Sequence, residues 1–90
     1  MKLKESINKL DKYFLRLKGG KAEEIKPKHV EKVIKKLTVK KQQLNDELVD
    51  ATKNSKQKRL KRKLLTVEEQ LERAEWLKGR IRSLGNPPGN

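Results

Sequence analysis

The chain contains no cysteine, which excludes disulfide bonds and cysteine-ligated metal sites. No apolar run approaches the roughly 18 residues that a membrane-spanning helix needs. The N-terminal residues lack the apolar core of a secretory signal. The absence of cysteine also fits a reducing compartment, and together these features predict a cytoplasmic protein.

Motifs that carry catalysis are missing too. The sequence has no glycine-rich phosphate loop, no nucleophile motif and no metal-ligand spacing. The only histidine, His29, has no partner at helical spacing, so we interpret it as an exposed residue of a first helical turn. Nothing indicates that the glutamates Glu68, Glu69, Glu72 and Glu75 line the buried pocket that acid–base catalysis requires. The sequence therefore predicts a binding protein that is not an enzyme and needs no cofactor.

Positive charge is what the sequence has in excess. It holds 25 Lys and Arg against 12 Asp and Glu, for a net charge of +13. Such a balance indicates an anionic partner, which is nucleic acid, an acidic protein or a membrane surface. Hydrophobic residues make up only 32% of the 90 residues. A single domain with a thin core is therefore expected, and narrow seams between long helices suit it best.

The first helix is predicted over residues 1–18. Its apolar residues recur in alternating steps of four and three, as on one face of an amphipathic helix. They are Leu3, Ile7, Leu10, Phe14 and Leu17. Gly19 and Gly20 end the helix, residues 19–27 form a linker, and Pro27 suits the first position of the next helix. A basic amphipathic helix can also lie on a membrane, but burial of this face in a protein core is the simpler interpretation.

Two later segments carry heptad patterns and predict an antiparallel helical hairpin over residues 28–84. The repeating apolar positions are Val30, Ile34, Leu37, Leu44, Leu48 and Ala51, then Leu60, Leu64, Val67, Leu71, Ala74 and Ile81. The turn is expected near residues 53–56, with Asn54 in the left-handed conformation and Ser55 as the N-cap of the next helix. Residues 85–90 should form a disordered tail. The predicted fold class is all-α: a short N-terminal amphipathic helix followed by a long, coiled-coil-like hairpin.

The two heptad patterns agree on one register. Facing residues of an antiparallel pair have numbers that add to a constant, and the value here is 108 for Leu44 with Leu64, Leu48 with Leu60, Leu37 with Leu71 and Ile34 with Ala74. Within one residue of this register, Lys35 with Glu72 and Asp50 with Arg59 flank the seam. Lys41 occupies a seam position opposite Val67, and we expect it to extend outward towards Glu68.

Unmatched positive charge concentrates at the tip of this hairpin. Residues 54–63 carry six basic residues and no acidic one. The residues predicted to contact phosphates of DNA or RNA are Lys53, Lys56, Lys58, Arg59, Lys61, Arg62 and Lys63. No aromatic residue lies nearby, so we expect binding to the backbone with little sequence specificity and strong salt dependence. The alternative is a solvated tip partly balanced by the acidic residues of 46–50.

A second functional hypothesis is a protein-interaction module, or a small regulatory or inhibitory protein of the kind that phages encode, docking on an acidic partner. Tyr13 and Trp76 are its candidate anchors, since aromatic residues are enriched at interfaces. A structural role for Trp76, covering the junction of the first helix with the hairpin, is favoured over this. The first helix can pack on its own hairpin or on a second copy, and the latter would give a homodimeric bundle.

Overall fold

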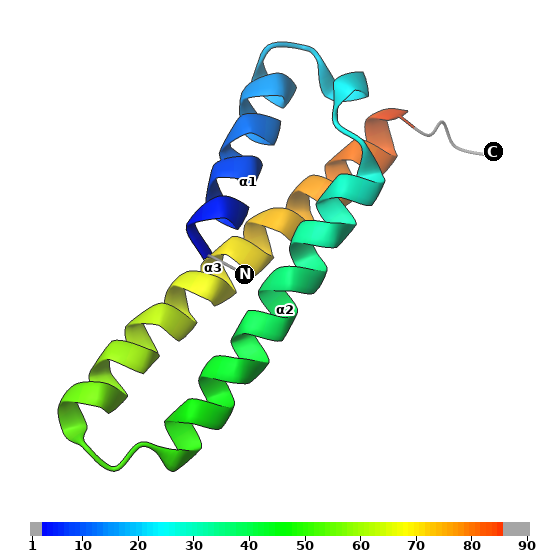
Figure 1. The fold of residues 1–90 in the computed structure, drawn as a ribbon. Helices are drawn as coiled ribbons and strands as arrows, with labels where there is room; N and C mark the ends of the chain where they lie inside the picture. Colours follow the sequence, from blue (N-terminus) through cyan, green and yellow to red (C-terminus); the bar gives the residue numbers. More distant parts are fainter. Residues whose placement is uncertain (1–2, 86–90) are drawn as a thin grey trace.

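Residues 3–85, the part of the chain that the computed structural model describes, contain three α-helices and a short 3-10 helix joined by short connections. In chain order they are α1 (Leu3–Lys18), η1 (Ala22–Glu24), α2 (Pro27–Asp50) and α3 (Asn54–Gly85). Figure 1 shows α2 and α3 running antiparallel along the length of the molecule, with α1 beside the half that is remote from their connecting turn. The predicted all-α fold with a long helical hairpin is confirmed.

The hairpin is held together by a narrow seam that follows the heptads. Val30, Leu37 and Leu44 of α2 are buried, as are Leu60 and Val67 of α3. The alternate positions Ile34, Leu48, Leu64 and Leu71 are partly buried and pack against this core. An apolar side chain every three or four residues is enough to bury one stripe of each helix, so the remaining faces are free to carry the charge.

Two interactions across the hairpin are consistent with the predicted register. The Gln57 side-chain amide donates to the Ala51 carbonyl at 2.8 Å, and the Lys78 ammonium lies 3.8 Å from the Glu31 carboxylate. The residue numbers of these pairs add to 108 and 109. They therefore lie at the expected register or one residue beside it.

The first helix packs on its own hairpin and touches both α2 and α3. Its most buried residues are Ser6, Leu10 and Tyr13, whereas Phe14, which the apolar spacing assigns to the core, is only partly buried. The buried face is thus rotated away from the predicted stripe. Tyr13 lies on the side of α2, beside His29 and Val33, whereas Phe14 stacks on the exposed Trp76 of α3 and is therefore only partly covered.

The linker between α1 and α2 is short and partly ordered by its own hydrogen bonds. Gly20 has a φ of 74°, and the Lys21 N–H donates to the Arg16 carbonyl at 2.8 Å. This is the glycine-dependent C-terminal cap that the sequence predicts. Ile25 is 2% exposed and adds to the core, and Pro27 begins α2 as expected.

The turn of the hairpin comes earlier than predicted. It spans residues 51–53 and not 53–56, since α2 ends at Asp50 and α3 begins at Asn54. Within residues 3–85 only a glycine has positive φ, so the expectation of a left-handed Asn54 is wrong. Ser55 lies inside the first turn of α3 and is not its N-cap.

Local interactions at the turn explain this difference. Ala51 adopts an extended conformation as the C-cap of α2, and its methyl group is buried at 8% exposure. Gln57 then makes two hydrogen bonds: its backbone N–H to the Lys53 carbonyl at 3.0 Å and its side chain to the Ala51 carbonyl. These bonds start the helix without a serine cap. At the other end α3 extends to Gly85, and the rest of the predicted tail, residues 86–90, lies outside the described residues.

Candidate nucleic-acid interface

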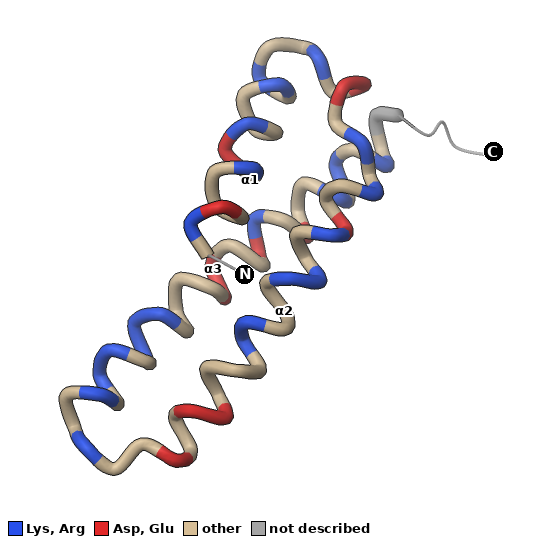
Figure 2. The backbone as a smooth tube through the Cα atoms, viewed as in Figure 1, with Lys and Arg blue, Asp and Glu red and all other residues tan. Residues whose placement is uncertain are grey.

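The basic residues predicted at the tip are brought together at one end of the molecule. Lys53 lies in the turn, and the other six occupy the first three turns of α3: Lys56, Lys58, Arg59, Lys61, Arg62 and Lys63. All seven are exposed. The molecule is about 51 Å long and 17 Å in its narrowest dimension, and Figure 2 shows this group along α3 beside the turn, at the end remote from α1. We call these seven residues the basic tip.

The arrangement around the helix follows from the seam. Leu60 is buried against α2, so the basic residues on either side of it in sequence point sideways or outward. At 100° per residue, Lys58 and Arg62 lie roughly opposite the buried face, and Arg59 and Lys63 lie on one flank. The positive charge therefore surrounds the exposed half of the helix and is not confined to one stripe.

The side chains of the basic tip make no ion pairs with other residues of the described region. Within residues 3–85, pairs closer than 4.0 Å join Arg73 to Asp11 and Lys78 to Glu31. The pairs expected from the register, Lys35 with Glu72 and Asp50 with Arg59, do not form. These side chains are exposed, and holding two long side chains in one geometry costs about as much free energy as their attraction in water provides.

The acidic residues at the end of α2 reduce the local charge without pairing. Asp46, Glu47 and Asp50 lie in the last turns of α2, which ends at the turn next to the basic tip. Seven positive charges against these three leave a local excess of four. Asp46 accepts a hydrogen bond from the Gln42 side chain at 3.0 Å, so it is engaged within its own helix.

The second pair of predicted site residues, Tyr13 and Trp76, is not brought to a common surface. Tyr13 is 7% exposed in the core between α1 and the hairpin, so little of its side chain is accessible, and its role as an interface anchor stays a prediction. Trp76 is 55% exposed and stacks on Phe14, with ring centroids 5.8 Å apart and planes 13° from parallel. The favoured interpretation of Trp76, as a cover for the junction of α1 with the hairpin, agrees with this stacking.

Two isolated polar residues have ordinary positions. Lys41 is half-buried at the seam, and its ammonium makes no ion pair with Glu68 within the described region. His29 is exposed in the first turn of α2, as expected.

No group of three or more His, Cys, Asp or Glu side chains within residues 3–85 is arranged to hold a metal ion. None of the helices there is both long and apolar enough to cross a bilayer.

Sequence reasoning missed the concave surfaces that α1 forms with the hairpin, and two of them bear on function. One, of about 460 Å³, is lined by Phe14, Glu69, Glu72, Arg73 and Trp76. The other lies between α1 and α2 and is lined mainly by basic residues. Both combine residues from helices whose relative position the heptads do not specify. Predicting these concave surfaces would have required the position of α1 on its own hairpin, which the sequence pattern does not give.

Comparison with known protein families, with characterised proteins and with solved structures finds no match to this chain.

Proposed function

We propose that this protein binds nucleic acid non-enzymatically, gripping the phosphate backbone through the basic tip with little sequence specificity. The observation that carries the proposal is the exposure of seven basic side chains, without ion-pair partners in the described region, around one end of the hairpin. Each Lys or Arg that neutralises a phosphate releases condensed counterions, and this release drives backbone binding. Phosphates of either DNA or RNA satisfy this chemistry.

The narrow tip supports binding to backbone and not to base edges or unstacked bases. The three aromatic residues of the chain lie where α1 packs on the hairpin, away from the basic tip. They are Tyr13, Phe14 and Trp76. Stacking on single-stranded bases needs aromatic platforms within the binding groove. We therefore expect probes of different sequence to bind with similar affinity at equal salt, and duplex probes, which have the higher charge density, to bind more tightly than single strands.

The test is the salt dependence of binding to labelled oligonucleotides, measured by fluorescence anisotropy. In the tip variant, Arg59→Gln, Arg62→Gln and Lys63→Gln are combined. For every phosphate that is no longer neutralised, the slope of log K against log salt should flatten by about 1, so we expect a reduction of about 2 to 3. The control variant, which combines the exposed Lys12→Gln, Lys28→Gln and Lys35→Gln, removes the same charge far from the tip. It should keep most of the slope.

Two results would contradict the proposal. One is no detectable binding by the unaltered protein at about 50 mM salt, where binding to the backbone is strong. The other is an equal flattening of the slope in the tip and control variants, which would mean that net charge and not the tip is responsible.

A protein-interaction role is the second candidate, favoured by the exposure of Trp76 beside a concave surface. Glu69, Glu72 and Arg73 line that surface, and their summed charge is negative, so it does not suit the acidic partner expected from the net charge of the chain. An acidic protein would have to bind the basic tip instead. Affinity capture with and without nuclease separates the two candidates, because a nucleic-acid-mediated complex disappears on digestion.

A further inference from the structure

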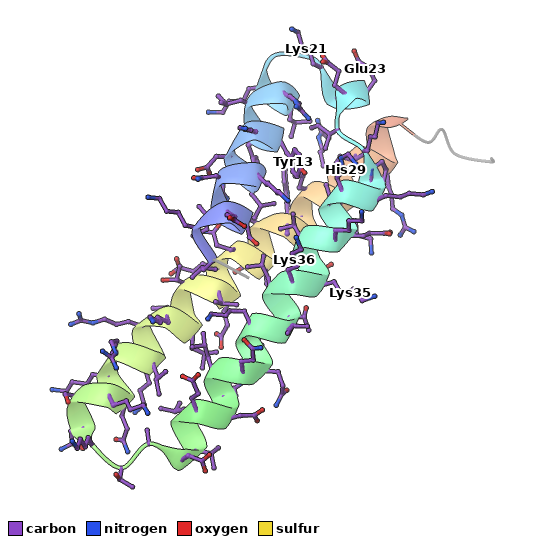
Figure 3. All side chains as sticks on the ribbon, viewed as in Figure 1. Tyr13, Lys21, Glu23, His29, Lys35 and Lys36 are labelled. Carbon is purple, nitrogen blue, oxygen red and sulfur yellow. The ribbon has the colours of Figure 1, made fainter. Side chains whose placement is uncertain are left out.

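A cleft between α1 and α2 has the chemistry of an anion site. Its volume is about 310 Å³, at the lower end of the roughly 300–1,000 Å³ of small-molecule pockets. Its lining is Lys9, Tyr13, His29, Lys32, Val33 and Lys36. Figure 3 shows Tyr13 between α1 and α2, with His29 and Lys36 on the adjoining part of α2, while Lys35 points away. We call this concave surface the basic cleft.

The floor of the basic cleft is fixed and its rim is charged. Tyr13 and Val33 are 7% and 2% exposed, so they are held by the core. Lys9, Lys32 and Lys36 are exposed and contribute three ammonium groups from two helices. Every charged residue of the lining is a lysine, and none of the three makes an ion pair within the described region.

A further cation lies next to the floor. The guanidinium carbon of Arg16 is 5.8 Å from the centre of the Tyr13 ring, and Arg16 donates to the Glu24 carbonyl at 3.4 Å. Docking of α1 on α2 therefore gathers like charges that repel one another. A multiply charged anion among them would relieve this repulsion, and each ammonium has three N–H donors for its oxygens.

We infer that the basic cleft binds a phosphate group, such as that of a small phosphorylated molecule, and that the bound group fastens α1 to α2. Lys9, Lys32 and Lys36 supply the charge, His29 supplies a ring N–H, and the Tyr13 hydroxyl is available at the floor. This site is distinct from the basic tip, which lies at the other end of the molecule. It does not depend on the proposed nucleic-acid function.

The experiment is thermal unfolding in inorganic phosphate or pyrophosphate, compared with chloride at equal ionic strength. A ligand that binds only the folded state raises Tm in a saturable manner, and we expect a rise of about 3 °C or more. The rise should be larger for pyrophosphate, which carries more charge. A linear rise without saturation, or no rise, would overturn the inference.

The cleft variant, combining Lys9→Gln, Lys32→Gln and Lys36→Gln, makes the test specific. Without phosphate it should be more stable than the unaltered protein, because the repulsion is gone. It should also lose the phosphate-induced rise. The control variant, with Lys12→Gln, Lys28→Gln and Lys35→Gln, removes equal charge from the same two helices and should keep that rise. Equal responses of the two variants would indicate general anion association and refute a site.

Two further arms identify the source of the phosphate and its independence from the tip. An oligonucleotide without terminal phosphate should give a smaller cleft-dependent rise than pyrophosphate. If its rise is as large and disappears in the cleft variant, the anion site stands and its ligand is nucleic-acid backbone. The tip variant should keep the phosphate-induced rise, so a failure of nucleic-acid binding leaves the basic cleft testable.

Discussion

Arg73 of α3 joins α1 to the hairpin through its guanidinium group. That group lies 3.0 Å from the Asp11 carboxylate, donates to the Gln70 side chain at 2.8 Å and sits 4.7 Å from the centre of the Phe14 ring. The numbers of Arg73 and Lys36 add to 109, so near the predicted register the two residues form a like-charge pair with no evident benefit within the hairpin. The contacts with Asp11 and Phe14 of α1 explain why an arginine occupies position 73. The heptad pattern could not predict them, because it relates only α2 to α3.

The interactions of Arg73 differ in their expected contributions. The pair with Asp11 is partly exposed, so Asp11→Asn should lower the free energy of unfolding by about 1 kcal/mol or less. Arg73→Ala should lower it by about 1–2 kcal/mol, because the interaction with the Phe14 ring contributes a further 0.5–1 kcal/mol or so. Urea denaturation of the two variants measures the difference. Equal effects of the two substitutions would show that the ring interaction contributes nothing.

At the scale of the helices, features that follow from a local sequence pattern could be predicted, whereas features that depend on long-range packing could not. The seam between α2 and α3 could be predicted because seven-residue periodicity and a short connection specify both partners. The exact turn could not, since burial of Ala51 and the two hydrogen bonds of Gln57 outweigh the capping preference of Ser55. The rotation of α1 depends on both hairpin helices at once, and no repeat in its own residues encodes it.

The docking of α1 can be tested with matched leucines on the same helix. Leu10 is 0% exposed and Leu15 is 69% exposed. Leu10→Ala should cost about 2–5 kcal/mol of stability, whereas Leu15→Ala should stay within about 0.5 kcal/mol. Trp76 is the only tryptophan and stacks on Phe14 of α1, so its fluorescence reports undocking.

In Leu10→Ala we expect the Trp76 emission to shift to longer wavelength at a lower urea concentration than in the unaltered protein. The shift should precede or accompany the loss of helicity seen by circular dichroism. A variant that unfolds at the same urea concentration as Leu15→Ala would contradict the packing of α1 on its own hairpin.

For the molecule as a whole, we expect repulsion among like charges to be the dominant electrostatic effect on stability. The net charge is +13, and only the pairs Arg73 with Asp11 and Lys78 with Glu31 are closed within residues 3–85. Such exposed pairs contribute about 0–1 kcal/mol each. A large net charge, by contrast, destabilises a compact state through self-repulsion. Salt screens both the attraction within ion pairs and the repulsion among like charges. The larger of these two effects determines whether added salt raises or lowers Tm.

Raising NaCl from about 50 mM to about 500 mM should therefore raise Tm by several degrees, because the screening length shortens to a few ångströms. The tip variant, with three fewer positive charges, should gain less. Calorimetry at several salt concentrations measures both, and a falling Tm would mean that ion pairs outweigh repulsion. Nucleic-acid binding should weaken over the same range while the fold becomes more stable. These opposite trends ensure that weaker binding at high salt cannot be attributed to unfolding, so the salt slope of the unaltered protein reports phosphate neutralisation.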